Sequence, residues 1–191
     1  MKIPNNMVNA LALFLSLFSA IGCTSKKAEE VKFSSSSMDP VEISAQKIKV
    51  FSAEKNAYIW VERIYKSDEE WKKQLSPLSL EVTRQKGTER AFSGKYADNH
   101  AKGIYSCICC GTDLFTSDTK FESGTGWPSF WQPIAKENIS TASDSDLGYE
   151  RTEVMCARCG AHLGHVFDDG PKPTGLRYCM NSVALNFTPS K

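Results

Sequence analysis

The chain has 191 residues and a formal net charge of +1, from 23 lysines and arginines against 22 aspartates and glutamates. No basic stripe stands out, so the composition gives no support to a nucleic-acid-binding surface. The sequence shows no internal repeat, and the part from Ser67 onward is long enough for one domain with a modest core.

Residues 1–23 have the pattern of an export signal. The apolar stretch 8–22 follows a positive start at Lys2 and is short for a membrane span, which needs about 20 residues. It ends in Ser-Ala-Ile-Gly-Cys23, which resembles a bacterial lipoprotein box and implies cleavage before Cys23 and attachment of lipid to its sulfur. The alternative is an ordinary secretory signal with an incidental cysteine. We expect an exported protein in either case. If Cys23 carries lipid, we expect the protein to be held to a bacterial envelope membrane, on the periplasmic side or at the surface.

Two segments separate the signal from the domain. Residues 24–49 are polar, include four consecutive serines at 34–37 and lack apolar periodicity, so we expect a flexible tether. Residues 50–66 carry scattered aromatic side chains and form an N-terminal extension. The sequence leaves open whether this extension packs on the domain, which we place at residues 67–191.

The domain begins with one clear helix signal. Ser67 precedes an acidic first turn and is a plausible cap for a helix from Asp68 to Leu75, which Ser76-Pro77 would end. Beyond it, short apolar runs are broken by Gly, Pro, Asp and Asn. This pattern predicts a mainly antiparallel β-sheet fold.

Four of the seven cysteines form two matched CxxCG pairs, Cys107/Cys110 and Cys156/Cys159. CxxCG is the shape of a zinc knuckle, and two knuckles predict a closed, structural four-sulfur site for Zn²⁺. In an oxidising compartment the alternative is two disulfides. A thioredoxin-type redox role for one pair is a weaker alternative. Cys109, inside the first knuckle, is expected to be a spare or buried thiol.

Cys179 lies outside the metal set, in a run that has the pattern of a strand. Alternate residues of a strand share a face, which places three polar and then three apolar side chains on one side: Arg177, Cys179, Asn181, Val183, Leu185 and Phe187. We expect the polar half to face a cleft and the apolar half to lie in the core. A guanidinium beside Cys179 would lower the pKa of the thiol, and only the thiolate is a strong nucleophile.

Two histidines and an aromatic loop accompany this cysteine. His162 and His165 would point to opposite faces of a regular strand, but Gly164 between them would permit a bulge that turns both toward one site. Trp127, fixed by Pro128 on a glycine-flanked turn, would be a good wall for a small apolar group such as a methyl. The alternative is that either histidine, or the indole, is an ordinary core residue.

These motifs together resemble the methionine-R-sulfoxide reductase B family, in order and over roughly residues 67–187. The matching pieces are SP (76–77), VTRQKGTE (82–89), FSGKY (92–96), GIY (103–105), the two CxxCG pairs, KF (120–121), SG (123–124), GWPSF (126–130), AHLGHVF (161–167), DGP (169–171) and GLRYCMNS (175–182). Motifs of this length and number are specific. The resemblance implies two antiparallel sheets with short N-terminal helices, a structural zinc in many members, and reduction of methionine-R-sulfoxide in peptides and proteins.

Carried onto this chain, the resemblance makes Cys179 the nucleophile. Methionine would leave as the thioether, and Cys179 would remain as a sulfenic acid. His162, His165 and Asn181 would line the sulfoxide site with ordered water and help to protonate the leaving oxygen. Arg177 and Asp169 would tune the thiolate and the histidines, and Trp127 would cover the methyl of the substrate.

One position departs from the family pattern. Many members carry a recycling cysteine in the loop before GWPSF, where this chain has Thr125. Three routes of regeneration remain: a thioredoxin-like partner, a small thiol, or Cys109. We rank Cys109 last because it is held in the first knuckle and would have to reach Cys179 within disulfide distance.

Two other functions compete with this interpretation. A zinc-ribbon binding module on a lipid anchor would explain the four paired cysteines but not Cys179 with its histidines. A thiol–disulfide exchange protein would use a CxxC pair, and stoichiometric zinc on all four thiolates would exclude it.

Overall fold

The structure is a computed structural model that describes residues 46–145 and 148–190. The predicted export signal, including Cys23, and the predicted tether up to residue 45 lie outside these residues. Within the described ranges, no helix is long and apolar enough to cross a membrane.

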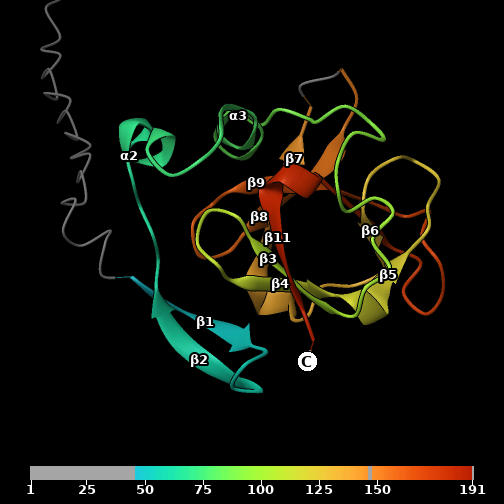
Figure 1. Ribbon diagram of the computed structural model, residues 1–191, viewed down its shortest axis with the longest axis horizontal. Coiled ribbons are helices and arrows are strands. Elements are labelled where there is room, and N and C mark those ends of the chain that lie inside the picture. Colours follow the sequence, from blue (N-terminus) through green and yellow to red (C-terminus); the bar gives the residue numbers. More distant parts are fainter. Residues whose placement is uncertain (1–45, 146–147, 191) are drawn as a thin grey trace, which may run out of the picture. The chain divides into compact units, whose positions relative to one another are not determined.

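Most of the regular secondary structure of the domain consists of antiparallel strands, as predicted (Figure 1). Six strands form one sheet in the order β5-β6-β10-β9-β8-β7, and three form a second in the order β11-β3-β4. The bounds of the first are β5 (Lys120–Phe121), β6 (Ser129–Phe130), β7 (Ile139–Asp144), β8 (Arg151–Cys156), β9 (His162–Phe167) and β10 (Arg177–Met180). Those of the second are β3 (Gly103–Cys107), β4 (Asp113–Thr116) and β11 (Leu185–Pro189).

An aromatic cluster joins the two sheets. Phe130 of β6 stacks on Phe115 of β4, with ring centroids 4.4 Å apart, and meets the edge of Tyr105 of β3 at 5.0 Å. All three rings are fully buried. Burial of one such side chain stabilises a fold by about 1.5–3 kcal/mol, so these rings are a main part of the core.

Two short helices precede the sheets, and the second corrects our expectation for Ser76-Pro77. Helix α2 (Asp68–Lys72) begins at the predicted cap Ser67, whose side chain and that of Glu70 form a reciprocal capping box. Ser76-Pro77 does not simply end that helix. The hydroxyl of Ser76 accepts from a backbone N–H of the next turn and Pro77 is the first residue of α3 (Pro77–Gln85), the position where proline is favoured.

The N-terminal extension packs on the domain, the point that the sequence left open. It forms a hairpin of β1 (Lys47–Ser52) and β2 (Ala57–Glu62), so regular structure begins three residues inside the predicted tether. The side-chain amide of Asn138 accepts from the N–H of Phe51 at 2.7 Å and donates to its carbonyl at 2.8 Å. The N–H of Ile64 donates to the carbonyl of Arg158, between the two cysteines of the second knuckle.

Strand β9 contains the predicted bulge. Gly164 pairs with Val154, but the next pair joins His162 with Met155, so Leu163 is the extra residue. Gly164 has φ +156°, and a Cβ there would lie 2.1 Å from the carbonyl oxygen of Cys179 on β10. Glycine is therefore required at this crossing, and the bulge turns both histidines toward each other, with ring centroids 5.3 Å apart.

The strand predicted from Arg177 to Phe187 is not continuous, which corrects the sequence interpretation. It breaks after Met180 into a 3-10 turn (η3, Ser182–Ala184), and the chain then enters the other sheet as β11. The buried carboxylate of Glu89 accepts hydrogen bonds from the N–H groups of Ser182 (2.6 Å) and Val183 (3.0 Å). These N–H groups are thus satisfied outside a sheet. Arg177 and Cys179 lie in the six-stranded sheet, Leu185 and Phe187 lie in the three-stranded sheet, and Asn181 and Val183 lie in the connection between them.

Candidate functional site

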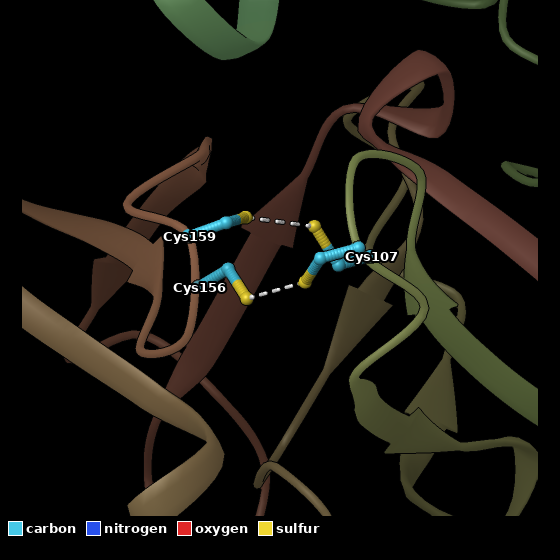
Figure 2. A group of neighbouring side chains, drawn as sticks. Cys107, Cys156 and Cys159 are labelled. Carbon is cyan, nitrogen blue, oxygen red and sulfur yellow. Dashed lines mark hydrogen bonds between the residues drawn. The ribbon is translucent and has the colours of Figure 1, made fainter. Parts of the chain in front are cut away.

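The four cysteines of the two CxxCG pairs converge on one point. Their sulfurs all lie within 4.8 Å of one another. Figure 2 shows the sulfur of Cys107 facing that of Cys159, at 3.7 Å, and a second contact joins Cys110 and Cys156 at 3.5 Å. A disulfide requires about 2.05 Å, so these contacts are not disulfides. A tetrahedral ion with bonds of about 2.3 Å would separate its sulfurs by about 3.8 Å, so the cluster has the dimensions of a metal site.

Each knuckle turns through a glycine in the left-handed region. Gly111 has φ +73° and Gly160 has φ +65°, and each donates its N–H to the carbonyl of the first cysteine of its pair. A side chain would be strained at these two positions. Cys109 is buried beside the cluster but is not one of its four members.

Cys179 opens into a separate cavity of about 220 Å³ on the six-stranded sheet. In the register of the sheet, Cys179 lies directly between Ser129 of β6 and His165 of β9. Directly opposed residues of antiparallel strands place their side chains on the same face. The described residues that line the cavity are Thr88, Trp127, Tyr149, Arg151, Gly164, His165, Phe167, Cys179, Met180 and Asn181.

His162 lies behind this cavity and is held by a buried carboxylate. Its Nδ1 is 2.8 Å from Oε1 of Glu153, whose other oxygen accepts from Nζ of Lys86 at 2.8 Å. Burial lowers the pKa of His162, although Glu153 opposes this. Burial also acts to raise the pKa of Glu153, but the hydrogen bonds from Lys86 and His162 outweigh it and hold that pKa below its usual range. At neutral pH the pair is therefore a carboxylate and a neutral imidazole with its proton on Nδ1.

His165 lines the cavity and has a matching partner. Its Nε2 is 2.6 Å from Oδ2 of Asp144, and the same oxygen accepts from a guanidinium N–H of Arg151 at 2.6 Å. Asp144 and Arg151 are mostly buried at the end of the β7–β8 pair. An ionised carboxylate can only accept hydrogen bonds, so in this contact Nε2 of His165 donates its hydrogen to Asp144. Nδ1 is then the ring nitrogen that can accept a proton.

The thiol of Cys179 is subject to opposing effects. Burial raises its pKa and is the largest of them, while the guanidinium of Arg177 and hydrogen bonds from Thr125 and Ser129 act to lower it. Arg177 is itself held by a two-point ion pair with Asp169, at 2.8 and 2.9 Å. The predicted influence of Arg177 is thus present, but burial outweighs it, so Cys179 is protonated in the resting site at neutral pH.

This geometry agrees with comparisons to known proteins. The family model of the SelR domain matches residues 75–189. Peptide methionine sulfoxide reductase MsrB of Leptospira interrogans is 57% identical over 124 residues, which are 65% of this chain and 95% of that protein. The enzyme of the same name from Methanosarcina barkeri is 59% identical over 124 residues, 65% of this chain and 87% of the relative. The chain belongs to the peptide methionine-R-sulfoxide reductase family, MsrB.

A longer match comes from a plant. Peptide methionine sulfoxide reductase B1, chloroplastic, of Arabidopsis thaliana is 50% identical over 169 residues, 87% of this chain and 81% of that protein. The family match from residue 75 to residue 189 includes both knuckles, the aromatic loop and the Cys179 segment.

The MsrB fold brings most of the predicted site residues together, although not all of them reach the cavity. Cys179, His165, Asn181 and Trp127 line it, and His162 lies behind it. Both groups of the Asn181 amide have backbone partners: Oδ1 accepts from the N–H of Glu89 at 3.0 Å, and Nδ2 donates to a carbonyl of β9 at 3.1 Å. In this conformation Asn181 shapes the cavity more than it offers free hydrogen-bonding groups.

Thr125 lies beside Cys179. It occupies the position at which many members of the family have a recycling cysteine. Its hydroxyl oxygen is 3.9 Å from the sulfur of Cys179 and 2.8 Å from the hydroxyl of Ser123. Ser123 in turn accepts from the hydroxyl of Ser129 at 2.7 Å. The thiol therefore faces a short chain of hydroxyl groups, none of which can form a disulfide.

Sequence reasoning missed the carboxylates that hold the histidines. Arg151 and Glu153 alternate along β8, just before the second knuckle, and this period-two placement of two charges on one strand was a usable signal. The sequence holds no such signal for Asp144 or Lys86. The pairing of β7 with β8 brings Asp144 to the site, and the end of α3 brings Lys86 there.

The opposing effects on Cys179 predict how its reactivity depends on pH. Arg177→Met removes the largest effect that lowers the pKa of the thiol, so that pKa rises further. A thiol reacts with iodoacetamide only when ionised, so the rise of the alkylation rate with pH should move to higher pH in the variant. We expect alkylation of Cys179 at a fixed pH of 8 to slow by about threefold to tenfold, since one pKa unit is a factor of ten.

The measurement is peptide-level mass spectrometry after timed alkylation, which separates Cys179 from the other cysteines. Lys102→Met, which removes an exposed cation paired with Asp118, is the matched control and should leave the rate unchanged. An unchanged profile in Arg177→Met would show that the guanidinium has no influence on the thiol.

Proposed function

We propose that the chain reduces methionine-R-sulfoxide in peptides and proteins to methionine by attack of Cys179, and so repairs oxidised proteins. The observation that carries the proposal is the row of Ser129, Cys179 and His165 across three paired strands, in which Cys179 and His165 line a cavity with an indole wall. The sulfoxide sulfur would meet Cys179, its methyl would lie against Trp127, and its oxygen would face His165.

The protonation states support a proton transfer within the site. Cys179 starts as a thiol because burial raises its pKa. His165 takes the proton on Nδ1 as the thiolate forms, and the carboxylate of Asp144 stabilises the resulting imidazolium through Nε2. The same proton then passes to the sulfoxide oxygen, which is a poor leaving group until protonated. The reaction balances as Cys-SH + R₂S=O → Cys-S-OH + R₂S, with the sulfoxide reduced and Cys179 oxidised by two electrons.

His162 has a supporting part in this scheme. It is neutral, with Nδ1 bound to Glu153, and its Nε2 is buried without a hydrogen-bond partner among the described residues. A buried acceptor of this kind is expected to hold an ordered water. Such a water would join the two imidazoles to the leaving oxygen.

The cycle closes with an external reductant. Thr125 removes the usual internal disulfide, so we assign reduction of the Cys179 sulfenic acid to a thioredoxin-like protein or a small thiol. Two thiols then convert Cys-S-OH to Cys-SH and water, and leave as a disulfide.

We further propose that the four-cysteine cluster holds a structural Zn²⁺. The donors are four thiols and no other atoms, they are mostly buried, and their spacing fits a tetrahedral ion. No open position is left for substrate, so the ion would stabilise the fold and take no part in the chemistry.

For export, we propose that Cys23 carries the lipid anchor and that the protein is held to a bacterial envelope membrane, on the periplasmic side or at the surface. This rests on the apolar stretch and the small residues before Cys23.

The catalytic proposal predicts stereospecific turnover. A soluble chain that begins after Cys23, supplied with dithiothreitol, should reduce the R but not the S diastereomer of a methionine sulfoxide peptide. Cys179→Ser should lower the rate by at least about 10³-fold, because a hydroxyl is not ionised at neutral pH. Separation of the diastereomers by chromatography after timed reaction is the measurement.

Cys109→Ser is the matched control and should keep full turnover. Mass spectrometry after one equivalent of substrate should find the oxidation on Cys179 alone. A peptide in which Cys109 and Cys179 are joined would reverse our ranking of the regeneration routes. A folded protein that turns over neither diastereomer would favour a zinc-ribbon binding module instead.

The metal proposal predicts about one zinc per chain by elemental analysis. Cys110→Ser should lose the metal and lower the melting temperature by about 10 °C or more, because a structural zinc contributes several kcal/mol of folding free energy. Cys109→Ser, one residue away but outside the cluster, should retain the metal. Two disulfides, detected as the absence of free thiols at the four positions, would contradict the proposal.

The anchor proposal predicts that Cys23 is labelled when expressing cells are fed radioactive palmitate. The label should be lost, and the protein should leave the membrane fraction, in Cys23→Ala. Release of unlabelled wild-type protein in soluble form would instead indicate an ordinary secretory signal.

A further inference from the structure

Phe92 is the most exposed of the large hydrophobic side chains in the described part of the chain, at 76% of its surface. It occupies the third position of a turn that the N–H of Ser93 closes on the carbonyl of Arg90, and its φ is +63°. This left-handed conformation costs a non-glycine residue about 1–2 kcal/mol. A side chain that is both strained and unburied contributes little to folding, and such strain is typical of functional positions.

The active-site loop holds Phe92 in this conformation. The N–H of Phe92 donates to the carbonyl of Gly126 at 2.9 Å. Gly126 has φ +89°, and a Cβ there would lie 2.7 Å from both the backbone nitrogen and the ring of Phe92. The ring therefore rests on the glycine that lies between Thr125, at the Cys179 sulfur, and Trp127, the wall of the catalytic cavity.

A second cavity, of about 310 Å³, lies beside the catalytic one. Phe92, Ala97, Gly126 and Trp127 form its apolar wall, and Asp98 and Glu122 line it too. Both carboxylates are already partnered, Asp98 by His100 at 3.1 Å and Glu122 by Lys120 at 3.1 Å. The side of this cavity that an apolar ligand can cover is the wall of Phe92, Ala97, Gly126 and Trp127.

Trp127 lines both cavities, so they are neighbours across a single indole. A polypeptide that places an oxidised methionine at Cys179 has its adjacent side chains within reach of the second cavity, because successive residues of an extended chain are only about 3.3 Å apart. An apolar side chain there would cover the exposed ring of Phe92.

We propose that the cavity beside Phe92 is a substrate-recognition subsite that takes an apolar side chain of the oxidised polypeptide, within two residues of the methionine sulfoxide. The inference rests on the proposed function and extends it. It makes the enzyme selective for methionine sulfoxide in apolar polypeptide segments over polar ones.

The test compares two substrates with dithiothreitol as reductant: free methionine-R-sulfoxide, and a peptide in which methionine-R-sulfoxide is flanked by leucines. Phe92→Gly removes the ring and suits the left-handed backbone, so the melting temperature should hold. We expect kcat/KM for the peptide to fall about tenfold, within the range that apolar pocket contacts provide, and that for the free amino acid to change less than about twofold. Trp60→Ala, which removes an exposed aromatic ring from β2, is the matched control and should affect neither substrate.

A second substrate separates the subsite from a general effect. With serines in place of the flanking leucines, wild-type kcat/KM should fall, and Phe92→Gly should cause no further loss. If Phe92→Gly lowered kcat/KM equally for the leucine and the serine peptide, Phe92 would be a support for Trp127 and the proposal would be overturned. An unchanged kcat/KM for the leucine peptide would also overturn it. Loss only when thioredoxin replaces dithiothreitol would assign the surface to the reductant. Failure of the wild type on every substrate would reject the proposed function itself.

Discussion

The four-cysteine cluster is the constraint on which the arrangement of the side chains around Cys179 depends. Cys107 ends β3 of the three-stranded sheet, and Cys156 ends β8 of the six-stranded sheet, so the cluster joins the two sheets at one point. Glu153 lies three residues before Cys156 on β8, and Arg151 two residues before that. Fixing the end of β8 therefore fixes the two charged side chains whose hydrogen bonds orient His162 and, through Asp144, His165. A structural site can thus control the geometry of a separate cavity.

The chemistry depends on a balance between burial and charge that the sequence could not supply. Arg177 beside Cys179 suggested an ionised thiol, but the guanidinium is shared with Asp169 and the sulfur lies in a largely apolar cavity, so burial determines the direction of the shift. A resting thiol resists unspecific oxidation, because the thiolate is the species that peroxides attack. The proton it retains is also the one that the sulfoxide oxygen requires, so the proposed reaction needs no proton from solvent.

The parts of the fold that the sequence predicted are those set by local chemistry. The CxxCG turns, the cap at Ser67 and the bulge at Gly164 each follow from a few neighbouring residues with special backbone or ligand properties. The parts it missed depend on contacts between distant residues. Glu89 breaks the strand after Cys179 from more than 90 positions away, and Asp144 reaches His165 only through the pairing of β7, β8 and β9. Burial of the sulfur and the register of strands are properties of the assembled sheet.

Thr125 has a consequence for the order of events in the proposed cycle. A recycling cysteine at that position would draw the oxidised sulfur into a disulfide, and the reductant would then attack this disulfide. Thr125 instead places its hydroxyl 3.9 Å from the sulfur of Cys179, and Cys179 lines the same cavity as Trp127 and His165. In the proposed cycle, the reductant thiol would have to reach Cys179 in the cavity that the substrate occupies. Methionine has to leave before reduction begins, so substrate and reductant occupy the enzyme in turn and compete for its entrance.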